Sequence, residues 1–197
     1  MGEEIKSALE IAMEKVEKLG GVTEEERLKW KYTPEGEKLA ARYLKQNLNL
    51  LAELSQYEES ARKYVIEGAQ DILTRNINLP KNDSARRNNK RAMDGLKIVK
   101  NDKVSVENVY SRIRRIFEHY VEQGESQRRQ VYESLKAEVE ARMQQVVKQQ
   151  LGPFAEIKVD VESQPQFQEE WRKVQAQLDL QYIKLLDEYK HELSAIP

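Results

Sequence analysis

The sequence predicts a mainly α-helical fold: an elongated bundle of long amphipathic, coiled-coil-like helices with a small β element. Apolar residues recur three, four or seven positions apart in three long stretches, which places them on one face of a helix. Charged residues make up 34% of the chain and hydrophobic residues 39%, a balance that suits long exposed helices better than a compact sphere. Residues 156–162 alternate apolar and charged side chains, which is the pattern of a strand with one buried face.

The first part of the chain carries clear helix boundaries. Residues 3–19 place their apolar side chains on one face, and Gly20 and Gly21 are expected to end this helix. Thr23 and Glu26 have the spacing of a capping box, in which each side chain accepts a hydrogen bond from the other residue's backbone. We expect this box to open a short helix.

A long helix is expected next, over residues 35–75. Thr33 followed by Pro34 is a typical helix start, because proline fits the first helical position. At 1.5 Å per residue this helix would be roughly 60 Å long. Gly68 weakens it by about 1 kcal/mol relative to alanine and need not end it.

Residues 81–104 are interpreted as a basic connector within a single domain that spans 1–197. Its first part is a candidate helix, capped by Asp83 or Ser84 and reaching Met93.

The second part of this connector is predicted to be a small hairpin with strands 96–100 and 103–106. Gly95, Asn101 and Asp102 favour it, because these residue types form turns. The alternative is a helix that places three apolar residues on one face: Ala92, Leu96 and Val99.

Two further long helices follow. Ser105 is a good N-cap for a helix over 105–151, which Gly152 is expected to end. Gly124 leaves open whether this helix breaks at its midpoint. The last helix is expected over about 165–194.

The predicted strand 156–162 lies in a short connector, 152–164, between these two helices. A lone strand leaves its backbone groups without partners. The strand is therefore expected to pair either with the 96–106 segment or with the same strand of another subunit.

The apolar stripes supply the residues expected to pack helices together, within one chain or between chains. Two or three thin helices bury little surface alone, so the sequence predicts a homo-oligomer, with a dimer favoured. The helix-packing or interface residues are Leu44, Leu48, Leu51, Val65, Ile72, Ile113, Phe117, Leu135, Trp171, Val174, Leu178 and Leu185.

A basic middle is the strongest charge signal in a chain whose formal net charge is -1. Residues 81–115 hold 11 basic and 4 acidic side chains, a net charge of +7. Such a cluster can bind phosphate groups by displacing counterions, or it can dock on acidic helices such as those in 1–26 and 116–197. The candidate anion-binding residues are Arg86, Arg87, Lys90, Arg91, Arg112, Arg114 and Arg115.

Recognisable enzyme chemistry is absent from the sequence. The chain has no cysteine, which excludes disulfides, thiolate catalysis and Cys-based metal sites. It has no glycine-rich phosphate loop and no nucleophile motif. Glu188 and His191 share a helix face, but the second such pair that a di-iron bundle needs is missing. The sequence therefore predicts no catalytic residue, cofactor or metal ligand.

We therefore expect a non-enzymatic helical interaction or assembly protein of the scaffold or adaptor kind, which self-associates through its apolar stripes. It could also bind another protein. The alternative function is binding of nucleic acid or another polyanion through residues 81–115. No segment reaches the ~18 consecutive apolar residues that span a bilayer, and no secretory signal is seen, so we expect a cytoplasmic protein without a membrane partner.

Overall fold

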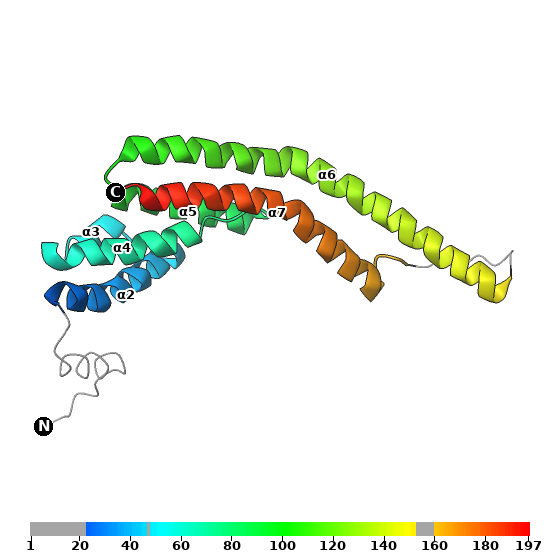
Figure 1. Ribbon diagram of the computed structural model, residues 1–197, viewed down its shortest axis with the longest axis horizontal. Coiled ribbons are helices and arrows are strands. Elements are labelled where there is room, and N and C mark those ends of the chain that lie inside the picture. The colour runs from blue at the N-terminus through cyan, green and yellow to red at the C-terminus, as the bar shows by residue number, and fades with distance from the viewer. Residues whose placement is uncertain (1–22, 47, 153–159) are drawn as a thin grey trace, which may run out of the picture. The chain divides into compact units, whose positions relative to one another are not determined.

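The computed structural model describes residues 23–46, 48–152 and 160–197, and the predicted helix 3–19 lies outside them. The mainly helical class is confirmed. The described helices, shown in Figure 1, are α2 (Glu24–Lys45), α3 (Leu50–Leu54), α4 (Glu59–Arg75), α5 (Asp83–Val99), α6 (Lys103–Leu151) and α7 (Pro165–Ala195).

Two compact units make up the chain. The first combines the described residues up to Ile77 with Arg87–Val106 and Ser194–Pro197. The second combines Asn78–Arg86 with Glu107–Leu193, and so contains most of α6 and α7.

The predicted β element is wrong for the residues that the structure describes. Both candidate strands in the connector are helical or in the turn between helices: 96–100 ends α5, and 103–106 begins α6. Of the candidate strand 156–162, residues 160–162 lie in a bend and a turn, and 156–159 lie outside the described residues.

The helical alternative for α5 is correct because its apolar face is buried. Ala92, Leu96 and Val99 are all in the core. Gly95 does not stop the helix but allows close packing, since a Cβ there would lie 2.8 Å from a Tyr43 ring carbon and 2.9 Å from a Leu73 methyl carbon. The turn propensity of glycine is overridden by these tertiary contacts.

The predicted capping box is confirmed at the start of α2. The Thr23 hydroxyl accepts a hydrogen bond from the backbone N–H of Glu26 at 3.2 Å, and the Glu26 carboxylate accepts one from the backbone N–H of Thr23 at 2.8 Å. The helix then continues through Pro34 to Lys45, so the predicted new start at Thr33 is wrong. Proline removes one backbone donor, which a helix held by tertiary packing can tolerate.

The single helix predicted over 35–75 is also wrong, because the chain forms α2, α3 and α4 there. The signal that was missed is Asn49, whose side chain accepts a hydrogen bond from the backbone N–H of Ala52 at 3.2 Å and caps α3. The chain leaves the helical conformation on both sides of this short helix.

Local caps also begin the later helices, slightly earlier than predicted. Asn82, and not Asp83 or Ser84, accepts the hydrogen bond from the backbone N–H of Ala85 at 2.8 Å before α5. Asp102 accepts the bond from the backbone N–H of Ser105 at 2.9 Å in α6.

The second long helix is unbroken. Its 49 residues run through Gly124, which corresponds to about 73 Å. It ends as predicted at Gly152, whose φ of 102° suits glycine. The last helix is also confirmed, as α7.

A close crossing of α2 and α4 organises the first unit. A Cβ at Gly36 would lie 1.9 Å from the backbone oxygen of Val65, and a Cβ at Gly68 would lie 2.1 Å from the backbone oxygen of Thr33. The two backbones therefore touch through glycine on both sides. Both glycines are buried, and no side chain could be fitted between them.

A buried lysine holds the residues after α7 in the first unit. Lys100, only 1% exposed, donates hydrogen bonds to the backbone oxygens of Ser194, at 3.5 Å, and Ile196. The backbone N–H of Asn101 donates to an oxygen of Pro197 at 2.9 Å. Burial lowers the pKa of the Lys100 amine below the ordinary lysine value.

Adding a methyl group at the α2 and α4 crossing should destabilise the protein. Gly36→Ala places its Cβ against the rigid backbone of Val65, so we expect a loss of about 2 kcal/mol or more of unfolding free energy, measured by urea denaturation followed by circular dichroism. Gly124→Ala is the matched control, because there the Cβ meets only side-chain ends, the nearest being the Arg128 guanidinium at 3.0 Å. Equal stability of the two variants would contradict the close crossing.

Candidate functional site

In the second unit α6 and α7 pair antiparallel. Contacts step backward along α7 as they step forward along α6. Arg112 donates to Glu192 at 3.0 Å, Tyr120 donates to Asp179 at 3.0 Å, and the Tyr132 ring lies 5.0 Å from the Trp171 ring. Figure 1 shows the two helices side by side over this part.

The half of this pair nearer to the start of α6 is well buried. Its core side chains on α6 are Val109, Tyr110, Ile113, Ile116 and Tyr120. On α7, Leu186 and Leu193 are also buried.

A buried polar network lies in the same half. Asp179 is 2% exposed. Its carboxylate accepts a hydrogen bond from the Tyr120 hydroxyl and forms an ion pair with the Lys81 amine at 2.6 Å. The Tyr182 ring packs edge-on against Tyr120 with centroids 5.1 Å apart. A buried carboxylate needs such partners, because an unpaired charge in the interior is costly.

The environment of Tyr120 makes its hydroxyl hard to ionise. Burial raises the pKa of Tyr120 to about 12, and the negative charge of Asp179 adds to the shift. The Arg128 guanidinium lies 4.2 Å from the Tyr120 ring centroid, and its positive charge partly opposes this rise in the pKa.

This network was missed by sequence analysis, although one signal was present. Asp179 precedes Leu186 by seven residues and Leu193 by fourteen, so all three share one helix face. An acid at a position otherwise occupied by leucine indicates a buried charge.

The other half of the pair is thin. Among α6 residues 125–151, only Val139 is buried, and it clusters with Val161 and Phe167. Tyr132, Leu135 and Met143 pack against this small cluster and remain partly exposed. We refer to α6 residues 125–151 together with residues 160–178 as the distal hairpin.

Contacts on both sides of the turn that precedes α7 fix the position of this turn against α6. Tyr132 packs edge-on against Phe167, with ring centroids 5.4 Å apart. Lys136 pairs with Glu162 at 2.6 Å, and this hydrogen-bonded pair lowers the pKa of the Glu162 carboxyl and raises the pKa of the Lys136 amine. The side chains of Lys136 and Glu162 are 32% and 50% exposed, so the pair positions the turn more than it stabilises it.

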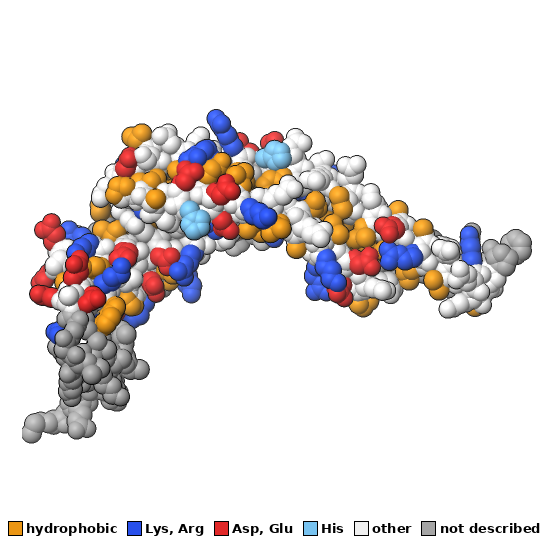
Figure 2. Space-filling view, in the orientation of Figure 1, with side chains coloured by type: hydrophobic (Ala, Val, Ile, Leu, Met, Phe, Trp, Pro, Cys, Tyr) orange, Lys and Arg blue, Asp and Glu red, His pale blue; other side chains and the backbone are white. Residues whose placement is uncertain are grey.

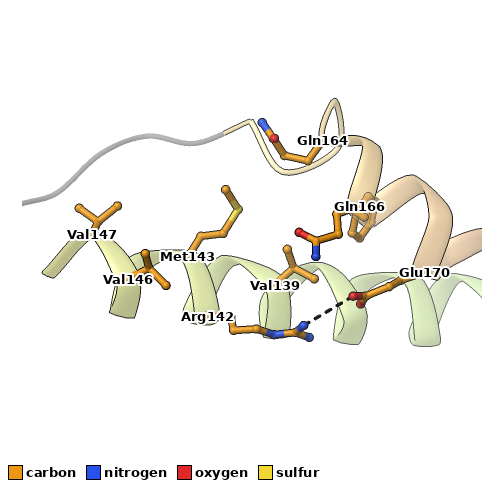
Figure 3. Close-up of a pocket in the computed structure, with 9 residues that line it drawn as sticks. Val139, Arg142, Met143, Val146, Val147, Gln164, Gln166 and Glu170 are labelled. Atoms are coloured by element: carbon orange, nitrogen blue, oxygen red, sulfur yellow. Dashed lines mark ion pairs between the residues drawn. The ribbon is translucent and has the colours of Figure 1, made fainter. Parts of the chain in front are cut away.

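An apolar groove opens beyond this small core, as Figure 3 shows. Its volume is about 280 Å³, slightly below the usual range of small-molecule pockets, ~300–1,000 Å³. Arg142 lies at its side and pairs with Glu170 across the two helices at 3.5 Å. The lining residues are Val139, Arg142, Met143, Val146, Val147, Gln164, Gln166, Phe167 and Glu170.

The lining of this groove is mostly apolar. Its only charged lining residues, Arg142 and Glu170, neutralise each other, and the remaining lining residues are aliphatic, aromatic or amide. None of them is a nucleophile or a histidine. Aliphatic and methionine side chains are typical of surfaces that accept an apolar helix.

Figure 2 shows hydrophobic side chains exposed between charged ones over the distal hairpin, at the right of the view. Exposed apolar side chains there and further along α7 are Val146, Leu151, Leu180, Ile183 and Leu185.

The predicted packing residues differ in burial. Val65 and Ile113 are buried, and Leu51 and Leu185 are exposed. The others lie half-buried: Leu44, Leu48, Ile72, Phe117, Leu135, Trp171, Val174 and Leu178.

Four of the seven predicted anion-binding residues contact groups of this chain. Arg86 pairs with Asp83, Arg112 with Glu192 and Arg114 with Glu107, and Arg91 donates to the backbone oxygen of Gln46 while stacking on Tyr43. For the other three, Arg87, Lys90 and Arg115, no contact of this kind is found among the described residues.

Residues 51–195 match a family of unknown function, DUF6657. The chain belongs to this family. No curated protein and no solved structure matched the chain.

The DUF6657 match covers the buried network and the groove, and it extends from α3 to α7. Within the described part of the chain, no group of three or more His, Cys, Asp or Glu side chains could hold a metal ion. No helix in that part is both long enough and apolar enough to cross a membrane.

Ionisation of Tyr120 should reduce stability at high pH. Its folded pKa of about 12 exceeds the ordinary value of 10.0, so the folded state holds this proton more tightly. The contribution to unfolding free energy, about 3 kcal/mol, is complete below pH 10 and is lost as the pH rises through 12.

The difference in urea stability between the wild type and Tyr120→Phe, measured from pH 8 to 12, isolates this contribution. We expect the difference to shrink as the pH rises. A difference independent of pH would show that Tyr120 titrates as an ordinary tyrosine.

Proposed function

We propose that this DUF6657 member is a non-enzymatic helical interaction protein that self-associates through its distal hairpin. The observation that supports this is the thin packing of that region, where α6 residues 125–151 bury one side chain, Val139. The apolar groove beside it offers a surface for a further helix.

The energetic reason is the apolar surface that two helices leave in water. Trp171, Val174 and Leu178 are only half-buried on α7, and Val146 is 49% exposed on α6. Fully burying an aliphatic or aromatic side chain contributes about 1.5–3 kcal/mol, so covering several of these would support a stable association. Covering them with another helix would complete a bundle.

Val146→Asp should dissociate the assembly without unfolding the chain, because Val146 is half-exposed in the folded monomer. Placing a charge in the buried contact should weaken the association and raise its dissociation constant at least about tenfold. Light scattering after size exclusion at a series of concentrations measures this.

Val104→Asp is the matched control, since Val104 is a valine of the same helix, is 72% exposed and lies in the first unit. It should keep the wild-type mass. A monomeric wild type at high concentration, or equal effects of the two variants, would overturn the proposal.

A second candidate function is polyanion binding through α5. Arg87 and Lys90 are exposed, lie about one turn apart and have no ion-pair partner among the described residues. Since the other arginines of the basic segment are mostly engaged within the chain, these two residues would make most of the phosphate contacts.

The double variant Arg87→Glu with Lys90→Glu should weaken binding of a fluorescent DNA duplex at least about tenfold at low salt, measured by anisotropy, and should lower the salt slope by about 2. The charge-matched variant Lys31→Glu with Lys184→Glu should bind like the wild type. Equal losses in both variants would contradict a site on α5.

A further inference from the structure

The groove belongs to a row of apolar residues that becomes progressively uncovered. Val139, Met143, Val147 and Leu151 lie four residues apart, and such a row forms a ridge on a helix. Val139 is buried against Phe167, Met143 and Val147 are half-buried, and Leu151 is 66% exposed. The row thus lines the hollow from Val139 to Val147 and ends in a projecting side chain, Leu151.

This gradient makes the row complementary to itself in one orientation. If two copies of α6 run antiparallel with a two-fold axis near residue 145, Leu151 of each copy lies over the hollow beside Val139 of the other. A parallel pairing would instead place Leu151 of one copy against Leu151 of the other, and the hollow of one copy against the hollow of the other. An interface with two-fold symmetry must be self-complementary, and only the antiparallel arrangement meets this condition.

Two charges beside the row, Glu140 and Lys148, favour the same orientation. Glu140 and Lys148 are exposed and have no ion-pair partner among the described residues. Antiparallel pairing sets Glu140 of one copy within about one turn of Lys148 of the second copy. Parallel pairing would set each of these charges against its own kind, which destabilises a helix pair.

We propose that the occupant of the groove is a second copy of this chain, bound antiparallel so that Leu151 of each copy fills the hollow of the other. This inference rests on the proposed self-association and specifies its geometry. The groove is slightly small for a typical ligand, but it is open at the side of α6 and suits an inserted leucine.

Disulfide cross-linking tests the orientation cleanly because the chain has no cysteine. Leu151→Cys and Glu140→Cys each introduce one thiol at an exposed position. In the antiparallel arrangement the two thiols of different copies approach each other, whereas two copies of Leu151→Cys lie about 18 Å apart along the helix. A disulfide requires Cα atoms within about 7 Å.

Mixing the two variants under mild oxidation should therefore give a disulfide-linked heterodimer, at least about tenfold more abundant than either self-linked dimer, as measured by non-reducing electrophoresis and mass spectrometry. Light scattering of the wild type and of Glu140→Cys in reduced form is measured in parallel, and both should show a dimer, because both keep Leu151.

Efficient self-linking of Leu151→Cys in a dimeric sample would overturn the antiparallel geometry and leave the proposed self-association standing. A monomeric wild type, with no cross-link between the variants, would overturn both, and would mean that this chain itself or another protein covers the groove. A dimer in which neither kind of link forms would place the interface elsewhere, and would overturn the proposed role of the groove.

Discussion

One constraint governs the second unit: among the described residues, the distal part of α6 packs only against α7 and the turn that precedes it. A helix in a two-helix pair can bury only the side that faces its partner. Nearer its start, α6 places a run of side chains from Val109 to Tyr120 in the core. Among residues 125–151 it buries only Val139, and the apolar surface left in water favours the proposed association there.

The buried network sets the register that forms the groove. If α7 slid by one turn, Asp179 would lose Tyr120 and leave a buried carboxylate partly unsatisfied, which the interior penalises strongly. Tyr132 follows Tyr120 on α6 by the same number of residues by which Phe167 precedes Asp179 on α7. The rings of Tyr132 and Phe167 are in contact. A polar interaction in the buried half therefore places the aromatic contacts from which the groove begins.

Part of the candidate site could be predicted from sequence. Helical spacing identified the apolar side chains of α6, including Leu135, but could not show that α7 begins too late to cover the residues after Val139. On α7 the predicted packing residues include Leu178 and Leu185, whereas the buried face runs through Asp179, Leu186 and Leu193. The two faces are one residue apart in sequence, and only a partner helix decides which is buried.

Features that depend on neighbouring residues could be predicted from sequence: the helical class, the capping box of Thr23 and Glu26, and the end of α6 at Gly152. Hydrogen bonds and backbone angles within one turn decide these features. Tertiary structure alone decided that Gly95 lies inside a helix, because its lack of a side chain admits Tyr43 and Leu73 from distant segments. It also decided that α2 and α4 cross at Gly36 and Gly68, since a backbone contact between distant segments leaves no local pattern in the sequence.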